Sequence, residues 1–318
     1  MYQVLLSSLW FLGCSDKEAE DTGPPQEEVQ TDHPICNALD LPTRPYDSTG
    51  PQMFRRHQPA GDFSVPLRDG STWTLSEKWT GCENYIFLPH WFSISPEKPE
   101  TYWSTGVLDL LIESDLNVHY FFVPARTSQE DADALGAQME EWIEEAMLGL
   151  TENQAKWWRD RLHVVGASSS DISGLLGDGF ASSVGSYGFG IDREQKIRTL
   201  GYFPHVSGYS NSLASAGEWP YENRLFAAAY EAIYFNFEAE RQIRLDAIDA
   251  TEVPVFGGDV IEQFEDGTLA LPDAQTMSTF DTMEIDIRME CPDKDKAEIG
   301  NCGAWDYLAH MWLYDDAN

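Results

Sequence analysis

The sequence predicts an α/β domain followed by the start of an all-β domain. Two short apolar runs, Tyr85–Leu88 and Asn117–Val123, alternate with segments of helical period, which is the pattern of an α/β fold. After Thr251 the period changes to that of β-strands. The chain has 318 residues, of which 42% are hydrophobic, so it is long enough for two cores and is not globally disordered.

The charge balance excludes one class of partner. The chain has 54 acidic and 20 basic residues and a formal charge of −34. Contacts with phosphate backbones require a basic face, so general nucleic-acid binding is excluded. Charge-driven docking on anionic lipids is disfavoured for the same reason. No apolar run reaches about 18 residues, so the sequence predicts no membrane-spanning helix.

The N-terminus has the pattern of an export signal. Val4–Gly13 is an apolar stretch about as long as a signal-peptide core, and Cys14 and a polar segment follow it. Residues 1–14 therefore resemble a bacterial lipoprotein signal, which implies lipid attachment at Cys14. Residues 15–54 are predicted to form an acidic, proline-containing tether, because Ser15–Pro34 has almost no large apolar side chains. We expect an exported outer-membrane lipoprotein, on the periplasmic or surface side, that meets the membrane through its lipid anchor only.

The cysteine count fits export. With Cys14 set aside for lipid, Cys36, Cys82, Cys291 and Cys302 remain, an even number. Four cysteines allow three pairings, and we choose Cys291–Cys302 with Cys36–Cys82 because the first two are close in sequence and flank a polar loop. A zinc site competes with this choice, but no CxxC or HxxxH spacing is present, so disulfides in an oxidising compartment are favoured and no metal site is expected.

Residues 55–205 are predicted to form the α/β domain with a mixed sheet. Asn117–Val123 is apolar without interruption, which suits a strand covered on both faces. Thr127 and Glu130 have the spacing of a capping box at the start of a long helix, and Thr151 precedes a shorter one. The predicted helices are Gln129–Met147, with an apolar stripe of Leu135, Met139, Trp142, Ile143, Ala146 and Met147, and Glu152–Arg161; the later strands are Leu162–Val165, Phe189–Ile191 and Lys196–Leu200.

Three stretches of this domain resemble the thioredoxin-like fold, in its peroxiredoxin and thiol-disulfide reductase branch. They are Ala60–Gly70 with Trp73–Ser76, Tyr85–Leu88 with His90–Ser93, and Tyr187–Arg198. The chemistry of that family needs a low-pKa thiolate just after the first strand of the sheet. Residues 91–96 contain no cysteine, Cys82 precedes the strand, and a serine cannot pass through a disulfide cycle. We therefore predict a redox-dead domain that acts as a scaffold or interaction module.

Residues 206–250 are predicted to form a helical connector. Ser207–Gly217 is a polar loop, and Trp219-Pro220 starts a long helix with proline at a permitted position. The apolar stripe predicted to pack into a core consists of Leu225, Phe226, Ala229, Tyr230, Ile233, Tyr234 and Phe237.

Residues 251–318 are predicted to form strands. Met283, Ile285, Ile287 and Met289 alternate with polar residues, which indicates a strand with one buried face. Ala304–Tyr314 has the composition of a second, aromatic-rich strand.

The stretch from Val253 to Trp312 resembles peptide-N-glycosidase F, a bacterial amidase that releases N-glycans from asparagine. The shared motif is Glu290-Cys291-Pro292, followed by Cys302 and then Trp305-Asp306. The resemblance implies the start of a jelly-roll sandwich, a Cys291–Cys302 disulfide, Asp306 as the catalytic residue and Trp305 as a substrate-binding residue. It also implies cofactor-free hydrolysis of the glycosyl-asparagine amide of an N-glycoprotein or glycopeptide.

The chemistry suits these residue types, since a carboxylate can activate water and tryptophan can stack on a sugar face. The family also uses acidic residues from later strands and a second jelly roll, whereas this sequence ends at Asn318, six residues after the match. We therefore expect a truncated amidase that is inactive by itself, so whether this chain is an enzyme stays open.

Two alternatives stay open as well. Asp293, Asp295 and Glu298 are candidates for a calcium loop, although an ordinary acidic loop is favoured. The alternative function is a non-catalytic, surface-tethered module that binds protein or glycan and has a degenerate thioredoxin-like domain. A thiol oxidoreductase is disfavoured by the missing cysteine.

Overall fold

The computed structural model describes residues 2–5, 9–13, 33–90, 102–104, 106–125, 128–181, 188–200, 224–248, 250–256, 259–261, 267–285 and 287–290. The chain divides into two compact units. The first, called here the α/β unit, spans Ser15–Asp249, and the second, the β unit, combines Met1–Cys14 with Ala250–Asn318. None of the described helices has the length and apolar content that crossing a bilayer requires.

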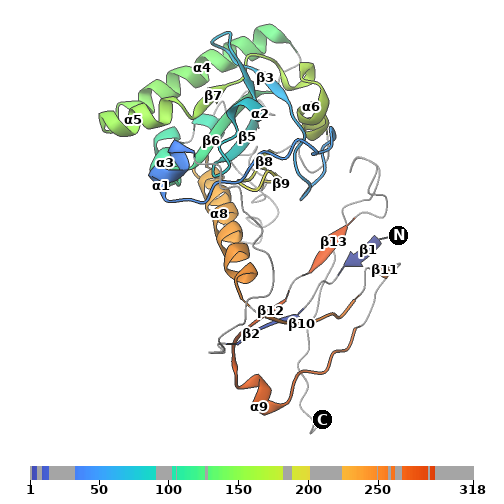
Figure 1. The fold of residues 1–318 in the computed structure, drawn as a ribbon. Coiled ribbons are helices and arrows are strands. Elements are labelled where there is room, and N and C mark those ends of the chain that lie inside the picture. Colours follow the sequence, from blue (N-terminus) through green and yellow to red (C-terminus); the bar gives the residue numbers. More distant parts are fainter. Residues whose placement is uncertain are drawn as a thin grey trace, which may run out of the picture. The chain divides into compact units, whose positions relative to one another are not determined.

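The α/β unit is built on a five-stranded mixed sheet of order β7-β6-β5-β8-β9 (Figure 1). Its strands are β5 (Asn84–His90), β6 (Val118–Pro124), β7 (Leu162–Val164), β8 (Phe189–Ile191) and β9 (Ile197–Thr199). β5, β6 and β7 are parallel, whereas β8 and β9 form an antiparallel hairpin beside β5. The predicted mixed α/β sheet is therefore confirmed.

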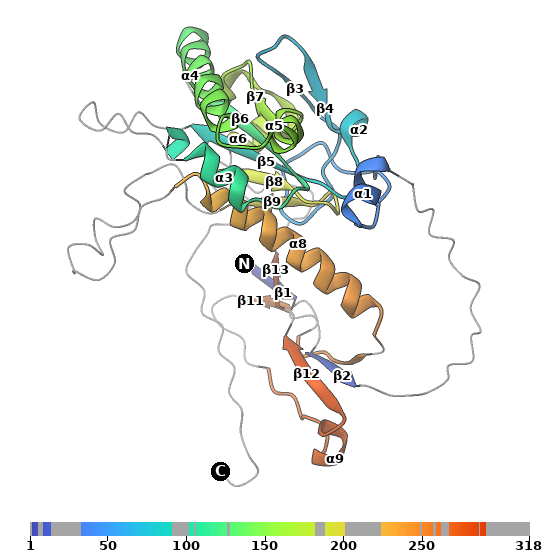
Figure 2. The ribbon, with the colours of Figure 1, turned by 90° about the vertical axis from the view of Figure 1, so that its left-hand side faces the viewer.

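A second hairpin, β3 (Ser64–Pro66) and β4 (Thr72–Thr74), is bridged to the end of β7 through Leu67 and Val165. The helices of the unit are α1 (Pro34–Leu39), α2 (Leu75–Lys78), α3 (Val107–Glu113), α4 (Gln129–Met147), α5 (Glu152–Arg159), α6 (Gly174–Ala181) and α8 (Ala227–Asp246), with short 3-10 turns η1 (Tyr102–Ser104) and η2 (Ser169–Asp171). Figure 2 shows β7 between α4 and the β3–β4 hairpin.

Two hydrophobic cores lie on the two faces of the sheet. Because successive side chains of a strand point to opposite faces, Ile86 and Phe122 pack with α3, α4 and α8. Phe87 and Phe121 pack instead with α6 and the β3–β4 hairpin, and their rings stack with centroids 4.5 Å apart. Coverage on both faces explains the uninterrupted apolar runs of β5 and β6.

The predicted helices are confirmed apart from their ends. α4 has the predicted bounds, but its N-cap is Ser128, whose hydroxyl accepts a hydrogen bond from the Asp131 amide at 3.2 Å. Thr127 lies outside the described residues. α5 begins behind Thr151, which forms a capping box with Gln154, and ends two residues before the predicted Arg161. α6 was not among the predicted helices; its Leu175, Leu176 and Phe180 are buried, so tertiary contacts stabilise a glycine-rich helix.

The apolar stripe predicted along α8 is wrong in three of its seven residues. The helix buries Ala228, Ala229, Ala232, Phe235 and Ala239 against the sheet. Tyr230, Tyr234 and Phe237 are instead 50%, 50% and 60% exposed. Small side chains allow the helix to approach the sheet closely, whereas the larger tyrosines are amphipathic and tolerate an exposed position.

Asn236 fixes the rotation of α8 about its axis. Its side-chain carbonyl accepts hydrogen bonds from the amides of Asn84 and Asn117, both at 2.9 Å. Its own amide donates to Asp115 Oδ2 at 2.7 Å and to Asn117 Oδ1 at 2.8 Å. A buried amide that satisfies all its partners in one geometry favours one orientation of the helix over others.

A disulfide joins Cys36 of α1 to Cys82, with Cα atoms 5.8 Å apart, which confirms the predicted pairing. Both cysteines are fully buried. The adjacent Gly81 has φ of +81°, and a Cβ added there would lie 2.1 Å from the carbonyl oxygen of Arg44. Glycine is therefore required where the segment after α1 crosses the chain before β5.

The β unit contains two three-stranded antiparallel sheets of order β11-β1-β13 and β10-β2-β12. Its elements are β1 (Tyr2–Leu5), β2 (Leu9–Gly13), β10 (Ala250–Val253), β11 (Asp259–Ile261), α9 (Ala274–Met277), β12 (Phe280–Ile285) and β13 (Arg288–Glu290). The apolar stretch predicted as a signal-peptide core thus forms strands. A jelly roll stays a prediction.

The single strand predicted across Met283–Met289 is two strands, β12 and β13. Its predicted apolar face is not buried, since Met283, Ile285 and Ile287 are 42%, 41% and 46% exposed. The strand period was therefore predicted correctly, but the burial of one face was not.

Candidate functional site

Ionisable side chains gather where the three parallel strands begin. Glu83 immediately precedes β5, His119 is the second residue of β6, and His163 is the second residue of β7. The amino ends of parallel strands lie at one edge of a sheet, so side chains distant in sequence meet there. Arg161, just before β7, joins them and completes what we call the Glu83 cluster: Glu83, His119, Arg161 and His163.

Glu83 and Arg161 form a buried ion pair. Arg161 donates from Nε at 2.9 Å and from Nη2 at 2.7 Å to Glu83 Oε1. The Arg161 guanidinium also lies 3.7 Å from the centre of the Trp157 ring and donates from Nη1 to the Trp157 carbonyl at 3.2 Å. Glu83 has no exposed surface, so this pair replaces the water that both charges lost on folding.

The two histidines extend the ion pair toward the surface. His119 Nε2 lies 3.3 Å from Glu83 Oε2, and His119 Nδ1 lies 3.0 Å from His163 Nε2. The two imidazole rings are nearly parallel, with an interplanar angle of 2°. The result is a continuous chain of contacts from the Arg161 guanidinium to His163.

The environment lowers the pKa of two of these groups, Glu83 and His163. The lower pKa favours the charged form of the carboxylate but the neutral form of the imidazole. Burial alone raises the pKa of Glu83, but hydrogen bonding and charge from His119 and Arg161 outweigh it and lower that pKa from 4.5 to about 2. Burial is also the main effect on His163, and with positive charge from His119, Arg161 and Lys78 it holds the His163 pKa well below its usual value. At neutral pH, Glu83 is therefore ionised and His163 is neutral.

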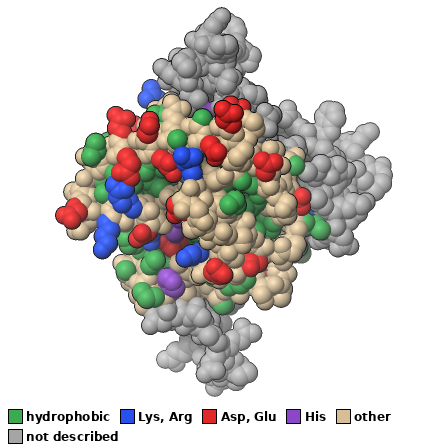
Figure 3. Space-filling view, turned by 90° about the horizontal axis from the view of Figure 1, so that it is seen from above, with side chains coloured by type: hydrophobic (Ala, Val, Ile, Leu, Met, Phe, Trp, Pro, Cys, Tyr) green, Lys and Arg blue, Asp and Glu red, His purple; other side chains and the backbone are tan. Residues whose placement is uncertain are grey.

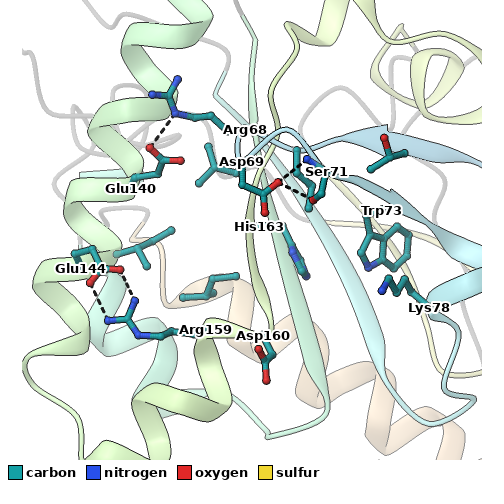
Figure 4. A pocket seen from close by; sticks show the side chains of 15 residues that line it. Arg68, Asp69, Ser71, Trp73, Lys78, Glu140, Glu144, Arg159, Asp160 and His163 are labelled. Atoms are coloured by element: carbon teal, nitrogen blue, oxygen red, sulfur yellow. Dashed lines mark hydrogen bonds and ion pairs between the residues drawn. The ribbon is translucent and has the colours of Figure 1, made fainter.

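A surface groove reaches the Glu83 cluster. It has two adjoining hollows of about 460 and 320 Å³, and both are lined by Trp73, Lys78, Asp160 and His163. We call this surface the histidine groove. α4 forms one wall, and the turn between β3 and β4 forms the other (Figure 4). Glu83, His119 and Arg161 line the smaller hollow.

The charges along the groove are mixed. Arg68 Nε donates to Glu140 at 2.9 Å, and Arg159 pairs with both oxygens of Glu144, so these two arginines are neutralised (Figure 4). Among the described residues, the Lys78 ammonium makes no hydrogen bond or ion pair. Figure 3 shows that Lys and Arg side chains are interspersed with Asp and Glu on the face seen from above. The overall charge of −34 is therefore not a uniform acidic coat at this face.

The sequence did not single out the Glu83 cluster, although it holds a usable pattern. Each of the three parallel strands has an ionisable residue next to its first residue, in Glu83-Asn84, Val118-His119 and Leu162-His163. Once the strands are known to be parallel neighbours, these residues must meet at one edge. Without the strand order, each one is an isolated polar residue in an apolar segment.

The structure describes some of the predicted site residues and leaves out others. Cys36 and Cys82 form the predicted disulfide. Asp306, Trp305, Cys291, Cys302 and Cys14 lie outside the described residues, as do Asp293, Asp295 and Glu298. The predicted amidase site, the second disulfide and the lipidation site therefore stay predictions. Within the described residues, no group of three or more His, Cys, Asp or Glu side chains is placed to hold a metal ion.

Comparison with known proteins assigns no family to this chain. No family model and no curated protein matches the chain. One similar solved structure is the solution structure of a candidate protein disulfide isomerase from Bacteroides thetaiotaomicron, which is 16% identical with a TM-score of 0.29. The match covers 52% of this chain and 91% of that protein. At this level of similarity no activity is transferred to the present chain.

Proposed function

We propose that the α/β unit is a thioredoxin-like domain without thiol chemistry, and that it serves as a ligand-binding module in an exported chain tethered through Cys14. The observation that supports this most directly is the bonding and burial of the described cysteines. Both described cysteines are buried in a disulfide that fastens α1 to the start of β5, and the segment after β5 has no cysteine in its sequence. No described side chain can therefore supply the thiolate that disulfide exchange requires.

The histidine groove supports the binding part of the proposal. It is an open, polar groove whose floor contains a neutral imidazole and whose rim contains an unpaired ammonium. The buried ion pair beneath contacts His119, and His119 contacts the His163 imidazole in turn. Preorganised polar groups at the edge of a rigid sheet are typical of a binding site.

The redox part is tested by catalysis of insulin reduction with dithiothreitol. We expect the full chain to leave the rate at that of dithiothreitol alone. A rate increase that disappears in the Cys36→Ala/Cys82→Ala double variant would show that the disulfide is catalytic and would overturn the proposal.

The binding part is tested by NMR of full-length chain with labelled histidine and tryptophan. Acetate, ethylammonium and glycerol serve as anionic, cationic and neutral probes. At least one of them is expected to shift the His163 and Trp73 signals in a saturable way. If none of the three classes does so, the groove is not a binding site for small polar ligands.

A second candidate function is the start of a peptide-N-glycosidase F-like amidase. It is favoured by the motif Glu290-Cys291-Pro292, Cys302 and Trp305-Asp306 and by the strands β12 and β13 that lead into it. The test is glycan release from a denatured glycoprotein by the longest product of the locus, with Asp306→Asn as the control. Release that is lost in this variant would establish the amidase, whereas equal release by both would remove Asp306 from the mechanism.

A further inference from the structure

We propose that α8 is the contact surface for a second copy of this chain, and that two α8 helices pair antiparallel along their outer faces. The proposal goes beyond the histidine groove, which no residue of α8 lines. It is argued from three observations: the spacing of the side chains on the outer face of α8, the division of that face into an aromatic and a basic half, and the fit of each half to the other.

The side of α8 that faces away from the sheet has a regular series of large side chains (α8 is orange in Figure 2). Tyr230, Tyr234 and Phe237 are half exposed or more, and the helical period places them opposite the buried alanines. Steps of four, three, four, three and four residues continue the series, and this alternation is the spacing of a coiled-coil contact face. We name the series the outer seam: Tyr230, Tyr234, Phe237, Arg241, Arg244 and, just beyond the helix, Ile248.

The aromatic half of the outer seam is held in place by contacts within the α/β unit. The Tyr230 hydroxyl donates to Glu113 Oε2 at 3.4 Å, and the Tyr234 hydroxyl donates to Glu238 Oε1 at 2.8 Å. Phe226 packs edge-on against Tyr230, with ring centroids 5.9 Å apart. Rings that are ordered before association lose little conformational freedom on binding, and tyrosine is enriched in protein interfaces for this reason.

The outer seam is complementary to itself when two copies run antiparallel. About a two-fold axis at the level of Ala239, each aromatic ring of one copy meets a residue from the other half of the seam in the second copy. The facing pairs are Phe237 with Arg241, Tyr234 with Arg244, and Tyr230 with Ile248. A guanidinium against an aromatic face is a favourable contact, and the two-fold axis forms each contact twice.

The parallel arrangement lacks this fit. It would place Arg241 against the same arginine of the second copy, and Arg244 likewise, so that like charges face each other in two layers of the seam. The distribution of aromatic and basic residues therefore selects the antiparallel pair.

The carboxylates beside the outer seam are compatible with this arrangement. Glu238 and Glu240 would approach their own copies near the axis, but each is compensated within its chain. Glu238 pairs with Arg198, and Glu240 lies 3.7 Å from Arg193 Nη1. Glu113, bonded to Tyr230, adds negative charge at the end of the seam that receives the arginines of the second copy.

The association is measured by sedimentation velocity of the full chain, from about 1 to about 300 μM. One pair of helices buries less surface than a typical stable interface, so we expect a reversible dimer with a dissociation constant on the order of tens of micromolar. Because the net charge of −34 repels two copies at long range, the measurement is made at about 0.15 M salt, where the Debye length is about 8 Å.

Single variants locate the contact. Phe237→Arg places an arginine against Arg241 of the second copy at both symmetric positions and is expected to weaken association about tenfold or more. Leu148→Arg, the same type of change at an exposed leucine behind α4, is the matched control and should leave association unchanged. Arg241→Glu removes both ring contacts of this layer and should also weaken association, whereas Lys156→Glu, at an exposed position of α5, should not.

A mixture of the two weakened variants tests the antiparallel register. In a mixed dimer, the new arginine of Phe237→Arg faces the new glutamate of Arg241→Glu, and the other layer keeps its native contact between Phe237 and Arg241. An equimolar mixture is therefore expected to associate within about threefold of wild type, although neither variant does so by itself. Circular dichroism first establishes that both variants are folded.

Four results would overturn the proposal. They are a wild-type chain that stays monomeric at the highest concentration, association that survives Phe237→Arg, equal weakening by Leu148→Arg, and a mixture of folded variants that associates no better than either one. None of these results bears on the histidine groove, because ligand binding there is read from His163 and Trp73.

Discussion

Replacement of Glu83 by glutamine should cost the α/β unit about 3 kcal/mol at pH 7. Two independent estimates agree on this magnitude. A fall in the Glu83 pKa from 4.5 to about 2 on folding corresponds to about 3 kcal/mol. Removing one partner of a buried ion pair costs about 3–5 kcal/mol, because it leaves the other charge, here Arg161 at 3% exposed, without compensation.

The same reasoning fixes the pH dependence. A carboxyl group whose pKa is lower in the folded state stabilises the fold fully above the pKa of the unfolded state, near 4.5, and this stabilisation is lost as the pH falls toward about 2. The difference between wild type and Glu83→Gln is therefore expected to be largest at neutral pH and to shrink below pH 4.5.

Hydrogen exchange with mass spectrometry, on peptides that cover β5 and β6, measures the opening free energy of this unit within the full chain. Glu144→Gln is the matched control, because Glu144 forms an exposed pair with Arg159 and its loss should cost less than about 1 kcal/mol. A cost below 1 kcal/mol for Glu83→Gln, or a difference from wild type that stays constant from pH 7 to pH 3, would refute the argument.

Three further predictions concern the same unit. Cys36→Ala/Cys82→Ala removes a crosslink with a sequence separation of 46 residues and should lower the unfolding free energy by about 4 kcal/mol, and a protein still as stable in urea as wild type would contradict this. Gly81→Ala places Cβ 2.1 Å from a backbone oxygen, whereas Gly70, also at positive φ, faces open space, so Gly81→Ala should lower the melting temperature more than Gly70→Ala does. Asn236→Ala removes the acceptor of the buried Asn84 amide and two hydrogen bonds to Asn117, and it should cost about 1–3 kcal/mol by the same exchange measurement, with an unchanged value arguing that the amide network is dispensable.

The helices and strands that could be predicted were those whose pattern of apolar residues matches the faces that are buried in the fold. α4 combines a helical stripe of apolar residues with polar neighbours, and its bounds were predicted from that period together with a capping pattern before it. β5 and β6 were recognisable because strands covered on both faces are apolar throughout. α6 was missed because its three glycines lower its helix propensity, and only the burial of its leucines makes it helical.

α8 shows where pattern reasoning fails. Its aromatic residues predicted one buried face, but the face that packs is defined by alanines and by the hydrogen bonds of Asn236. Apolarity measures the gain from burial, whereas the rotation of a helix also depends on how closely the backbone must approach its neighbour. The sequence alone gives the apolarity of each residue, but it does not give how closely the helix backbone must approach its neighbour.

The sequence by itself determined the alternation of strands and helices, the absence of a cysteine from the segment 91–96 that follows β5, the acidic charge and a chemically sensible choice of disulfide. Each of these depends on residue identity or on short-range periodicity. The tertiary structure alone decided that Glu83, Arg161, His119 and His163 form one chain of contacts. These residues are separated by as many as 80 positions, from 83 to 163. They meet because three parallel strands start at the same edge, and that strand order is set by the packing of the whole unit.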